Sequence, residues 1–483
     1  MRATFLSVAT LLGLSIAGTA SAQNGSSAQN GSSLVAADQA FVSHHQPSIA
    51  ITHVTLIDGS GAPPAKDMTV LFAGGRITAV GSSASTPVPK EATVIDGTGK
   101  TVVPGFVLMH EHMFYPLGQG HYGTYPEQFS RLYLASGATT IRTAGSLDPY
   151  ADLAVARAIK SGKQIGPDMD VTGPYIEGEP RLDRMPSVHG PDKVRELVNY
   201  WADEGVTSYK VYEHVSRADL RAAIEAAHAR GLKVTGHICS ITYEEAINAG
   251  IDNLEHSFME PSDFVPGRKP EECPSWEVRT ASLMALDPQG PEIQRLIKLL
   301  VDHKVALTST LPVTEVLIRG HRPTDEALAP LSPALRSSFD AMWTRLQPSQ
   351  MVNIMTGFVP KLLQFERAFV AAGGLLMAGS DPTSFGGTVP GTTAQRQLHM
   401  MLEGGFQLPE SIRIMSLNAA IYLGRDKEIG SVAAGKRADL VLLNGDLSAN
   451  VNAIDHVESV FKNGVAYDPV AIKKALAGTV GID

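Results

Sequence analysis

After residue 100 of this 483-residue chain, apolar strand-like segments alternate with polar loops and amphipathic helical patterns eight times. The strand candidates are residues 102–109, 138–142, 169–172, 207–211, 233–236, 253–255, 305–308 and 375–378. The clearest helical pattern is 218–230, with Ser216 as the expected N-cap and Gly231 as the stop. Further helices are expected at 193–204, 292–302, 362–372 and 393–403. Eight such units predict a (β/α)8 TIM barrel of the α/β class; a doubly wound open sheet is the competing fold.

Both ends of the chain carry shorter segments of strand composition. They lie at 51–57, 68–72, 76–80 and 92–95, and again at 430–432, 438–443 and 457–461. We expect these strands to pair with one another, so that the barrel is inserted in a small β-sandwich made by both chain ends. The predicted domains are therefore the sandwich, 49–104 with 427–470, and the barrel, 105–426.

The first residues have the pattern of a secretory signal. Arg2 precedes an apolar stretch, residues 5–17, and Ala20-Ser21-Ala22 matches the small-x-small cleavage site. We expect a signal peptide at 1–22, a flexible linker at 23–48, and a mature protein that is periplasmic or secreted and has no membrane span. Such a compartment would permit a bridge between Cys239 and Cys273.

The overall charge limits the classes of partner that the chain is expected to bind. The formal net charge is −9, and the sequence contains no stripe of basic residues. Both features argue against nucleic acid or an anionic membrane surface as partner. A small molecule is the expected partner, and the sequence leaves the oligomeric state open, a homo-oligomer included.

Polar residues of metal-binding type stand at the ends of the predicted barrel strands. His110 and His112 close the first strand, and side chains two residues apart on a strand point the same way. Later strands end in Lys210, His237, His256 and Asp381. A barrel would bring all six into one bowl, because catalytic groups gather at the carboxyl ends of its strands.

The joint pattern resembles the metal-dependent amidohydrolase superfamily, in its imidazolonepropionase-like and prolidase-like branch. The resemblance covers residues 50–465. It is carried by the six residues above together with Val103-Pro104-Gly105, Gly379-Ser380-Asp381, Asn418-Ala419-Ala420, Gly430-Ser431-Val432 and Gly435-Lys436-x-Ala438-Asp439-Leu440-Val441. Many members carry Asp just before the first histidine, where this chain has Leu108 and Met109.

The resemblance implies a two-zinc hydrolase. His110, His112 and Asp381 would hold one Zn²⁺, and His237 and His256 the other. Lys210 would react with CO₂ to give a carbamate that bridges both ions. A bridging hydroxide would attack a polarised carbonyl, and Asp381 would pass its proton to the leaving amine as general base and acid.

The substrate is less constrained than the reaction. An amide bond is expected, in a dipeptide, an N-acyl amino acid or a related carboxamide; carbamate or urea amides and lactones or esters are alternatives on the same site. Candidate substrate contacts are Tyr175, Tyr212, His214, Arg319 and His321, and residues 261–290 are the expected lid or specificity loop. Arg319 and His321 would suit a carboxylate or a polar tail, and exposure on the surface is the favoured alternative. The rival of another class is a non-catalytic barrel that serves in binding or assembly.

Overall fold

The computed structural model describes residue 34 and residues 36–118, 120–179 and 184–481. The predicted signal peptide, 1–22, and the first part of the predicted linker lie outside these residues. The rest of that linker is not plain coil, because it contains helix α1 (Ala36–Gln39) and strand β1 (Val42–His44). Strand β1 pairs with β19 (Val465–Tyr467), so this part of the segment belongs to the folded body.

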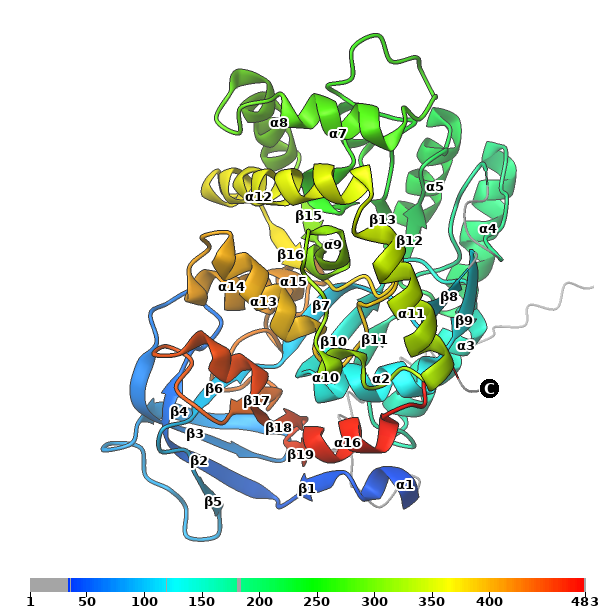
Figure 1. Cartoon of the computed structure of the whole chain (residues 1–483). Coiled ribbons are helices and arrows are strands. Elements are labelled where there is room, and N and C mark those ends of the chain that lie inside the picture. Colours follow the sequence, from blue (N-terminus) through cyan, green and yellow to red (C-terminus); the bar gives the residue numbers. More distant parts are fainter. Residues whose placement is uncertain (1–33, 35, 119, 180–183, 482–483) are drawn as a thin grey trace, which may run out of the picture.

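Eight parallel strands form two arcs at the centre of the molecule (Figure 1). The first arc has the order β11-β10-β7, with β7 at Phe106–Glu111, β10 at Ala138–Thr143 and β11 at Asp168–Asp170. The second arc runs β12-β13-β14-β15-β16. Its strands are Ser208–Val211, Lys233–Gly236, Asn253–Glu255, Ala306–Ser309 and Leu376–Ala378. All eight predicted strands are present, and together the arcs give a TIM-barrel-like arrangement.

No continuous ladder closes the two arcs into one sheet in the described part of the chain. At one junction, single parallel bridges join Thr172 to Ser208 and Ile176 to Val211. At the other, the amides of Ser380 and Asp381 both donate to the carbonyl oxygen of His110, at 3.2 and 2.9 Å. Strand β16 contacts β7, but after β16 the two backbones are joined at this one carbonyl oxygen and not by a regular ladder. This is the physical reason that the predicted closed barrel is not seen as a regular ladder.

Helices surround the arcs and connect successive strands. They are α2 (Pro126–Ala135), α3 (Pro149–Lys160), α4 (Pro191–Glu204), α5 (Arg217–Ala229), α6 (Tyr243–Ala249), α7 (Trp276–Met284), α8 (Pro291–Asp302), α9 (Leu311–Thr314), α10 (Asp325–Leu328), α11 (Pro333–Leu346), α12 (Gln350–Ala371), α13 (Thr393–Glu403), α14 (Leu408–Ile414) and α15 (Leu417–Tyr422). Short 3₁₀ turns lie at η2 (Ser257–Met259), η3 (Glu315–Leu317) and η4 (Val451–Asp455). A separate hairpin joins β8 (Phe114–Gly118) to β9 (His121–Thr124).

Strands from both chain ends pair in one nine-stranded sheet, where Figure 1 shows blue strands beside orange and red ones. The order is β1-β19-β18-β17-β6-β2-β3-β4, with β5 beside β2. The remaining bounds are Ser48–Leu56 (β2), Ala65–Ala73 (β3), Arg76–Ser82 (β4), Thr93–Asp96 (β5), Thr101–Pro104 (β6), Leu440–Leu443 (β17) and Val457–Lys462 (β18). Helix α16 (Pro469–Leu476) follows the last strand. Pairing between the two ends, which the sequence predicts, is therefore present.

This sheet presents an apolar face on each side. In β17, Val441 and Leu443 belong to the core shared with the barrel helices, whereas Leu440 and Leu442 pack into a second core with Phe72. The alternation follows from the two-residue period of a strand. None of the helices in the described residues is long and apolar enough to cross a bilayer.

Two sequence expectations differ from the structure. The segment 102–109 is not one strand: Gly105 divides it, with β6 in the nine-stranded sheet and β7 in the barrel-like part. A Cβ at Gly105 would lie 2.3 Å from the Thr139 hydroxyl oxygen, so the chain changes sheets where only glycine fits. The expected strand at 430–432 is irregular backbone, and it is held by a hydrogen bond from the Val432 amide to the Asp58 carbonyl oxygen.

Candidate metal centre

His110, His112 and Asp381 bring three ligand-type atoms together at the junction between β7 and the segment after β16. The Asp381 Oδ1 atom lies 3.3 Å from His112 Nε2 and 3.7 Å from His110 Nε2. Ligands about 2.1 Å from a tetrahedral zinc ion are about 3.4 Å apart, so this spacing suits one ion. All three side chains are buried. The residues present therefore fit a metal.

The second ring nitrogen of each histidine is already held by the protein. His110 Nδ1 lies 2.7 Å from Glu255 Oε2, and His112 Nδ1 lies 3.2 Å from the Gly145 carbonyl oxygen. A carboxylate and a carbonyl can only accept, so Nδ1 carries the proton and Nε2 keeps its lone pair. Glu255 is itself fixed by the Arg142 guanidinium. These contacts orient both rings toward Asp381.

Burial keeps these imidazoles neutral. It lowers the pKa of His110 to about 4, with Lys210 acting in the same direction. Burial also lowers the pKa of His112 and holds that of His256 well below its usual range. Burial opposes ionisation of Asp381, but the surrounding histidines hold the pKa of its carboxyl well below the ordinary value. Neutral imidazole and ionised carboxylate are the forms that bind metal.

Lys210 extends from β12 into the same space, where its Nζ atom lies 3.3 Å from His110 Nε2. The side chain is 1% exposed, and its Nζ atom faces the rings of Tyr175 and Tyr212 at 5.5 and 5.6 Å. Burial lowers the pKa of Lys210 to about 8, although Glu255 and Asp381 oppose that shift. About a tenth of the amine is therefore unprotonated at pH 7, far more than for an ordinary lysine, and this is the form that reacts with CO₂.

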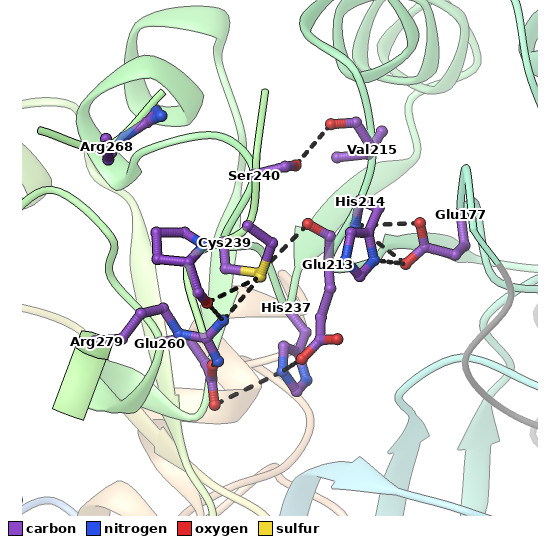
Figure 2. The surroundings of a disulfide bond; sticks show 12 residues. Glu177, Glu213, His214, Val215, His237, Cys239, Ser240, Glu260, Arg268 and Arg279 are labelled. Atoms are coloured by element: carbon purple, nitrogen blue, oxygen red, sulfur yellow. Dashed lines mark hydrogen bonds and ion pairs between the residues drawn. A yellow bond between two sulfur atoms is a disulfide. The ribbon is translucent and has the colours of Figure 1, made fainter. Parts of the chain in front are cut away.

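His237, at the end of β13, faces a different pair of groups. Its Nε2 atom lies 3.5 Å from Glu213 Oε1 and 3.6 Å from Glu260 Oε1, as Figure 2 shows. These three residues form a second group of possible metal ligands, separate from the first. Burial opposes protonation of His237, yet the two carboxylates raise its pKa to about 9.

His256 stands between the two groups. Its ring centroid is 4.6 Å from that of His110 and 4.5 Å from that of His237. His256 and Asp381 both have left-handed backbone, with φ of 60° and 51°. This conformation is uncommon for residues other than glycine and is concentrated at functional sites, so the fold holds both side chains at some cost in free energy.

A cavity of about 350 Å³ opens over these groups. Its lining includes His112, Lys210, His237, His256 and Asp381. The rest of the lining is mostly apolar or aromatic, and includes Tyr122, Tyr175, Tyr212, Met259, Trp276, Val313, Leu317, Met351, Met355 and Phe385. Trp276 comes from α7, so the predicted lid segment 261–290 does reach the cavity.

The structure separates the five candidate substrate contacts. Tyr175 and Tyr212 line the cavity. His214 does not; its backbone amide donates to Glu177. Arg319 and His321 are exposed and lie outside the cavity lining, which agrees with the alternative of surface exposure and not with contact to a substrate carboxylate. The reason is local: α9 and η3 follow β15 directly, and the last lining residue on that segment is Leu317.

Sequence reasoning missed the carboxylates that surround the histidines. Glu255 precedes His256, Glu213 follows Lys210 by three residues, and Glu260 follows His256 by four. A search a few residues beyond each strand end would have found them. Glu111, by contrast, points away from the metal-type group, as alternation predicts, and accepts a 2.8 Å hydrogen bond from the Ser380 amide.

Residues 101–466 match the model of the amidohydrolase family. The chain belongs to this family. Members of this family are metal-dependent hydrolases that act on carbon–nitrogen bonds, and the two groups of candidate ligands in this chain agree with metal dependence.

The individual proteins that resemble this chain share only a low sequence identity with it. An uncharacterised protein of Mycobacterium tuberculosis is 30% identical over 220 residues, which are 41% of this chain and 54% of that protein. The match thus spans about half the length of that curated relative. The imidazolonepropionase of a Geobacillus species is 23% identical over 453 residues, 85% of this chain and 95% of that enzyme. The solved structure of a candidate prolidase from Bifidobacterium longum aligns with a TM-score of 0.63 at 24% identity, covering 89% of this chain and 98% of that one. This last likeness supports the fold.

Proposed function

We propose that this amidohydrolase is a binuclear zinc enzyme that cleaves an amide bond. The observation that carries the proposal is the convergence of His110 Nε2, His112 Nε2 and Asp381 Oδ1 within 3.3–3.7 Å contacts. Lys210 Nζ lies 3.3 Å from the same His110 atom, where its carbamate would reach both ions. Bound zinc would polarise the carbonyl and supply a nucleophilic water-derived oxygen at neutral pH.

The chain's own residues would supply positioning and proton transfer. Asp381 is ionised and lines the cavity, so it can accept a proton and return it to the leaving amine. His110 and His112 are preoriented by Glu255 and Gly145. Tyr175 and Tyr212 would flank the scissile group, and Trp276 of α7 would restrict entry of water.

The substrate proposal follows the cavity wall. Among the lining residues that the structure describes, Lys210 is the only lysine or arginine. The absence of Arg319 from the wall removes the expected partner for a substrate carboxylate. The apolar wall therefore favours a second candidate, a neutral carboxamide, carbamate or urea amide with an apolar leaving group, over a free dipeptide or N-acyl amino acid.

The same proposal includes the finer architecture and the compartment. The two arcs would act as one closed barrel inserted between the strands of the chain ends, with those strands folded as a sandwich. Residues 1–22 would be removed as a signal peptide, releasing the enzyme to the periplasm or the medium.

The test is reconstitution of the purified protein with Zn²⁺ and bicarbonate. Metal content would be measured by mass spectrometry, and hydrolysis would be screened on N-acyl amino acids, dipeptides and neutral arylamides, carbamates and ureas. We expect bound zinc, and faster turnover of the neutral panel. A protein without bound metal or hydrolysis after reconstitution would favour the non-catalytic alternative.

A further inference from the structure

A second cavity, of about 430 Å³, lies beside the cavity of the candidate metal centre. The two cavities share the lining residues Tyr122, Ser384 and Phe385, which therefore form the boundary between them. His112 and Asp381 line the first cavity and not the second. The first cavity, at about 350 Å³, is at the small end of the range of about 300–1,000 Å³ that ligand sites occupy. The second cavity therefore offers room for a part of the substrate that extends away from the metal.

The lining of the second cavity is largely apolar. Helix α11, which packs against strand β8 (Figure 1), contributes Leu335, Phe339 and Met342, and β8 contributes Tyr115. Leu335, Phe339 and Tyr115 are buried. The Tyr115 hydroxyl accepts a 2.9 Å hydrogen bond from the Gly387 amide, which ties β8 to the segment after β16. These side chains can cover an aromatic or long aliphatic group of a ligand.

The boundary residue Phe385 is followed by two glycines that fit closely against the same side chains. A Cβ atom at Gly387 would lie 2.6 Å from Phe339 Cε2, and one at Gly386 would lie 3.0 Å from the Tyr115 hydroxyl oxygen. Both glycines have left-handed backbone, with φ of 83° and 75°. The segment is therefore packed against the lining of the second cavity, and this packing holds Phe385 between the two cavities.

Arg345 gives the second cavity a positive charge. It is an exposed residue near the end of α11 and lines the cavity. In the part of the chain that the structure describes, its guanidinium has no ion-pair or hydrogen-bond partner. Among the described lining residues, Arg345 and His121 are the only basic ones, and none is an aspartate or glutamate. A guanidinium without an acidic partner suits a planar carboxylate of a ligand.

We propose that the second cavity binds the distal part of the substrate, an aromatic or long apolar group that carries a carboxylate at its far end. The inference deepens the proposed function and rests on it for the reaction. The scissile amide would lie beside His112 and Asp381, the apolar group would pass Phe385, and the carboxylate would reach Arg345. Such a carboxylate is remote from the amide, unlike that of a dipeptide or an N-acyl amino acid, so the surroundings of the scissile bond stay neutral.

Substitutions on α11 alter the second cavity without changing a candidate metal ligand. Ala341 and Ser338 are exposed positions of its lining, so Ala341→Trp and Ser338→Trp would each fill it. Arg345→Gln removes the cation, and Arg345→Lys keeps it. The controls are Thr344→Trp, at an exposed position of α11 outside the lining, and Arg221→Gln, at an exposed arginine of α5. Circular dichroism and melting establish that each variant is folded.

Two series of amides vary the distal group on either side of an amide bond. The first series consists of the anilides of acetic, phenylbutyric and carboxyphenylbutyric acids. The second consists of the acetamides of butylamine, phenylbutylamine and carboxyphenylbutylamine. Hydrolysis is measured with the full chain reloaded with Zn²⁺ and bicarbonate. Binding of the same amides to chelator-stripped protein is measured by calorimetry, which tests the cavity without turnover.

In the wild type and both controls, the added phenyl group should raise kcat/KM and tighten binding to the stripped protein by about tenfold or more in one series, because a large apolar group is buried. The carboxylate should add about two- to fivefold, as expected for an ion pair near the surface. Ala341→Trp and Ser338→Trp should lose the first gain and keep the rate on the short amide. Arg345→Gln should lose only the second gain, which Arg345→Lys should retain in part.

A gain from the phenyl group in neither series would overturn the proposal. Equal losses on short and long amides in the folded tryptophan variants, or no loss on either, would also overturn it, and one folded tryptophan variant is enough to decide. A carboxylate gain that survives Arg345→Gln would overturn the assignment of the charged end. Long amides that bind the stripped wild type, bind more weakly to the tryptophan variants and are not hydrolysed by reloaded enzyme would support the second cavity and contradict the proposed function. Hydrolysis of short and long amides at equal rates would do the reverse.

Discussion

At the scale of single residues, Asp381 has contacts on both carboxylate oxygens. Oδ1 lies 3.3 Å from His112 Nε2 and accepts a 2.7 Å hydrogen bond from Thr383 Oγ1, whereas Oδ2 lies 3.8 Å from His256 Nδ1. An oxygen placed among neutral imidazoles can serve as a ligand while its partner handles a proton. The residue thus has two roles that a substitution can separate.

Replacing Asp381 by Asn should retain much of the bound metal but lower kcat roughly 10²–10⁴-fold, the usual contribution of a positioned acid or base. The amide keeps an oxygen for the metal but cannot accept the proton. Metal content and steady-state rates, measured on the same preparation, check this. A variant with wild-type kcat would show that the base is another group.

Glu366 illustrates a buried carboxylate away from the candidate ligands. It lies on α12, is fully buried and accepts a 3.1 Å hydrogen bond from Ser309 Oγ. Burial raises its pKa from 4.5 to about 7. A raised carboxyl pKa means that the folded protein binds the proton more tightly than the unfolded chain, so stability falls as pH rises from 4.5 to about 7.

Glu366→Gln removes that penalty. Relative to wild type, the variant should gain free energy of unfolding on the order of 2–3 kcal/mol between pH 4.5 and 8. Urea unfolding at several pH values measures the difference, in which the other titrating groups cancel. Parallel pH profiles for the two proteins would show that Glu366 is not protonated in the folded state.

The site residues were partly predictable for a physical reason. Histidines, Lys210 and Asp381 end strands, and strand ends can be located from apolar runs. Glu213 and Glu260 lie in the loops that follow, where no periodicity tells which side chain turns inward. Arg319 and His321 do not line the cavity, because the direction of the short helices after β15 decides which side chains reach it. Residue type alone does not reveal that direction.

At the scale of elements, periodic segments were predicted closely and transitions were not. Strand β14 and helix α13 have the expected bounds, and Ser216 caps α5 by accepting from the Asp219 amide. Helix α12, expected at 362–372, begins at Gln350 and continues through Pro360. A proline normally argues against a helix interior, so the sequence did not indicate the first half of this helix. The helix forms there because its apolar side chains pack into the main core.

The segment 261–290 is the element most open to experiment. It carries α7 and Trp276, and the Cys239–Cys273 disulfide ties it to the end of β13. Reduction, or the double change Cys239→Ala with Cys273→Ala, should release the segment, because the bridge limits how far it can open.

Limited proteolysis with mass spectrometry should then show several-fold faster cleavage within 261–275. KM should also rise more than kcat falls, because Trp276 loses its position over the cavity. The untreated, oxidised wild type serves as the reference. Equal cleavage in the reduced and oxidised proteins would mean that packing alone holds the segment.

At the scale of the whole molecule, Asp168 connects the barrel-like part to the strands of the chain ends. It lies on β11, and its carboxylate is 2.8 Å from Lys462 Nζ, 2.6 Å from Arg437 and 3.1 Å from Arg425. Burial opposes its ionisation, but Lys462 and Arg437 hold the pKa of Asp168 far below its usual range. The stability from this group is fully present at neutral pH, begins to decline below the ordinary carboxyl pKa, and is lost only as the pH falls through the much lower pKa of the folded state.

Asp168→Asn should lower the free energy of unfolding by roughly 2–3 kcal/mol at pH 7, because Lys462, 1% exposed, loses its anion. Asp170→Asn is the matched control, since Asp170 pairs only with Arg425, at 3.3 Å, in the interactions described. Denaturant unfolding of both variants at pH 7 measures the effect. An equal loss in the two variants would contradict this role.

The two arcs of parallel strands have one further consequence. His110 and His112 come from the three-stranded arc, whereas Asp381 follows the last strand of the five-stranded one. An ion shared by them would be a reversible cross-link across a seam where the Ser380 and Asp381 amides donate to the His110 carbonyl oxygen and Ser380 also bonds Glu111. Chelation should therefore speed hydrogen exchange at the amides of Ser380 and Asp381, while amides within β13 and β14 keep their rates. Equal rates with and without metal would mean that the seam is mechanically independent of the ion; unequal rates would make metal supply a control on rigidity as well as on chemistry.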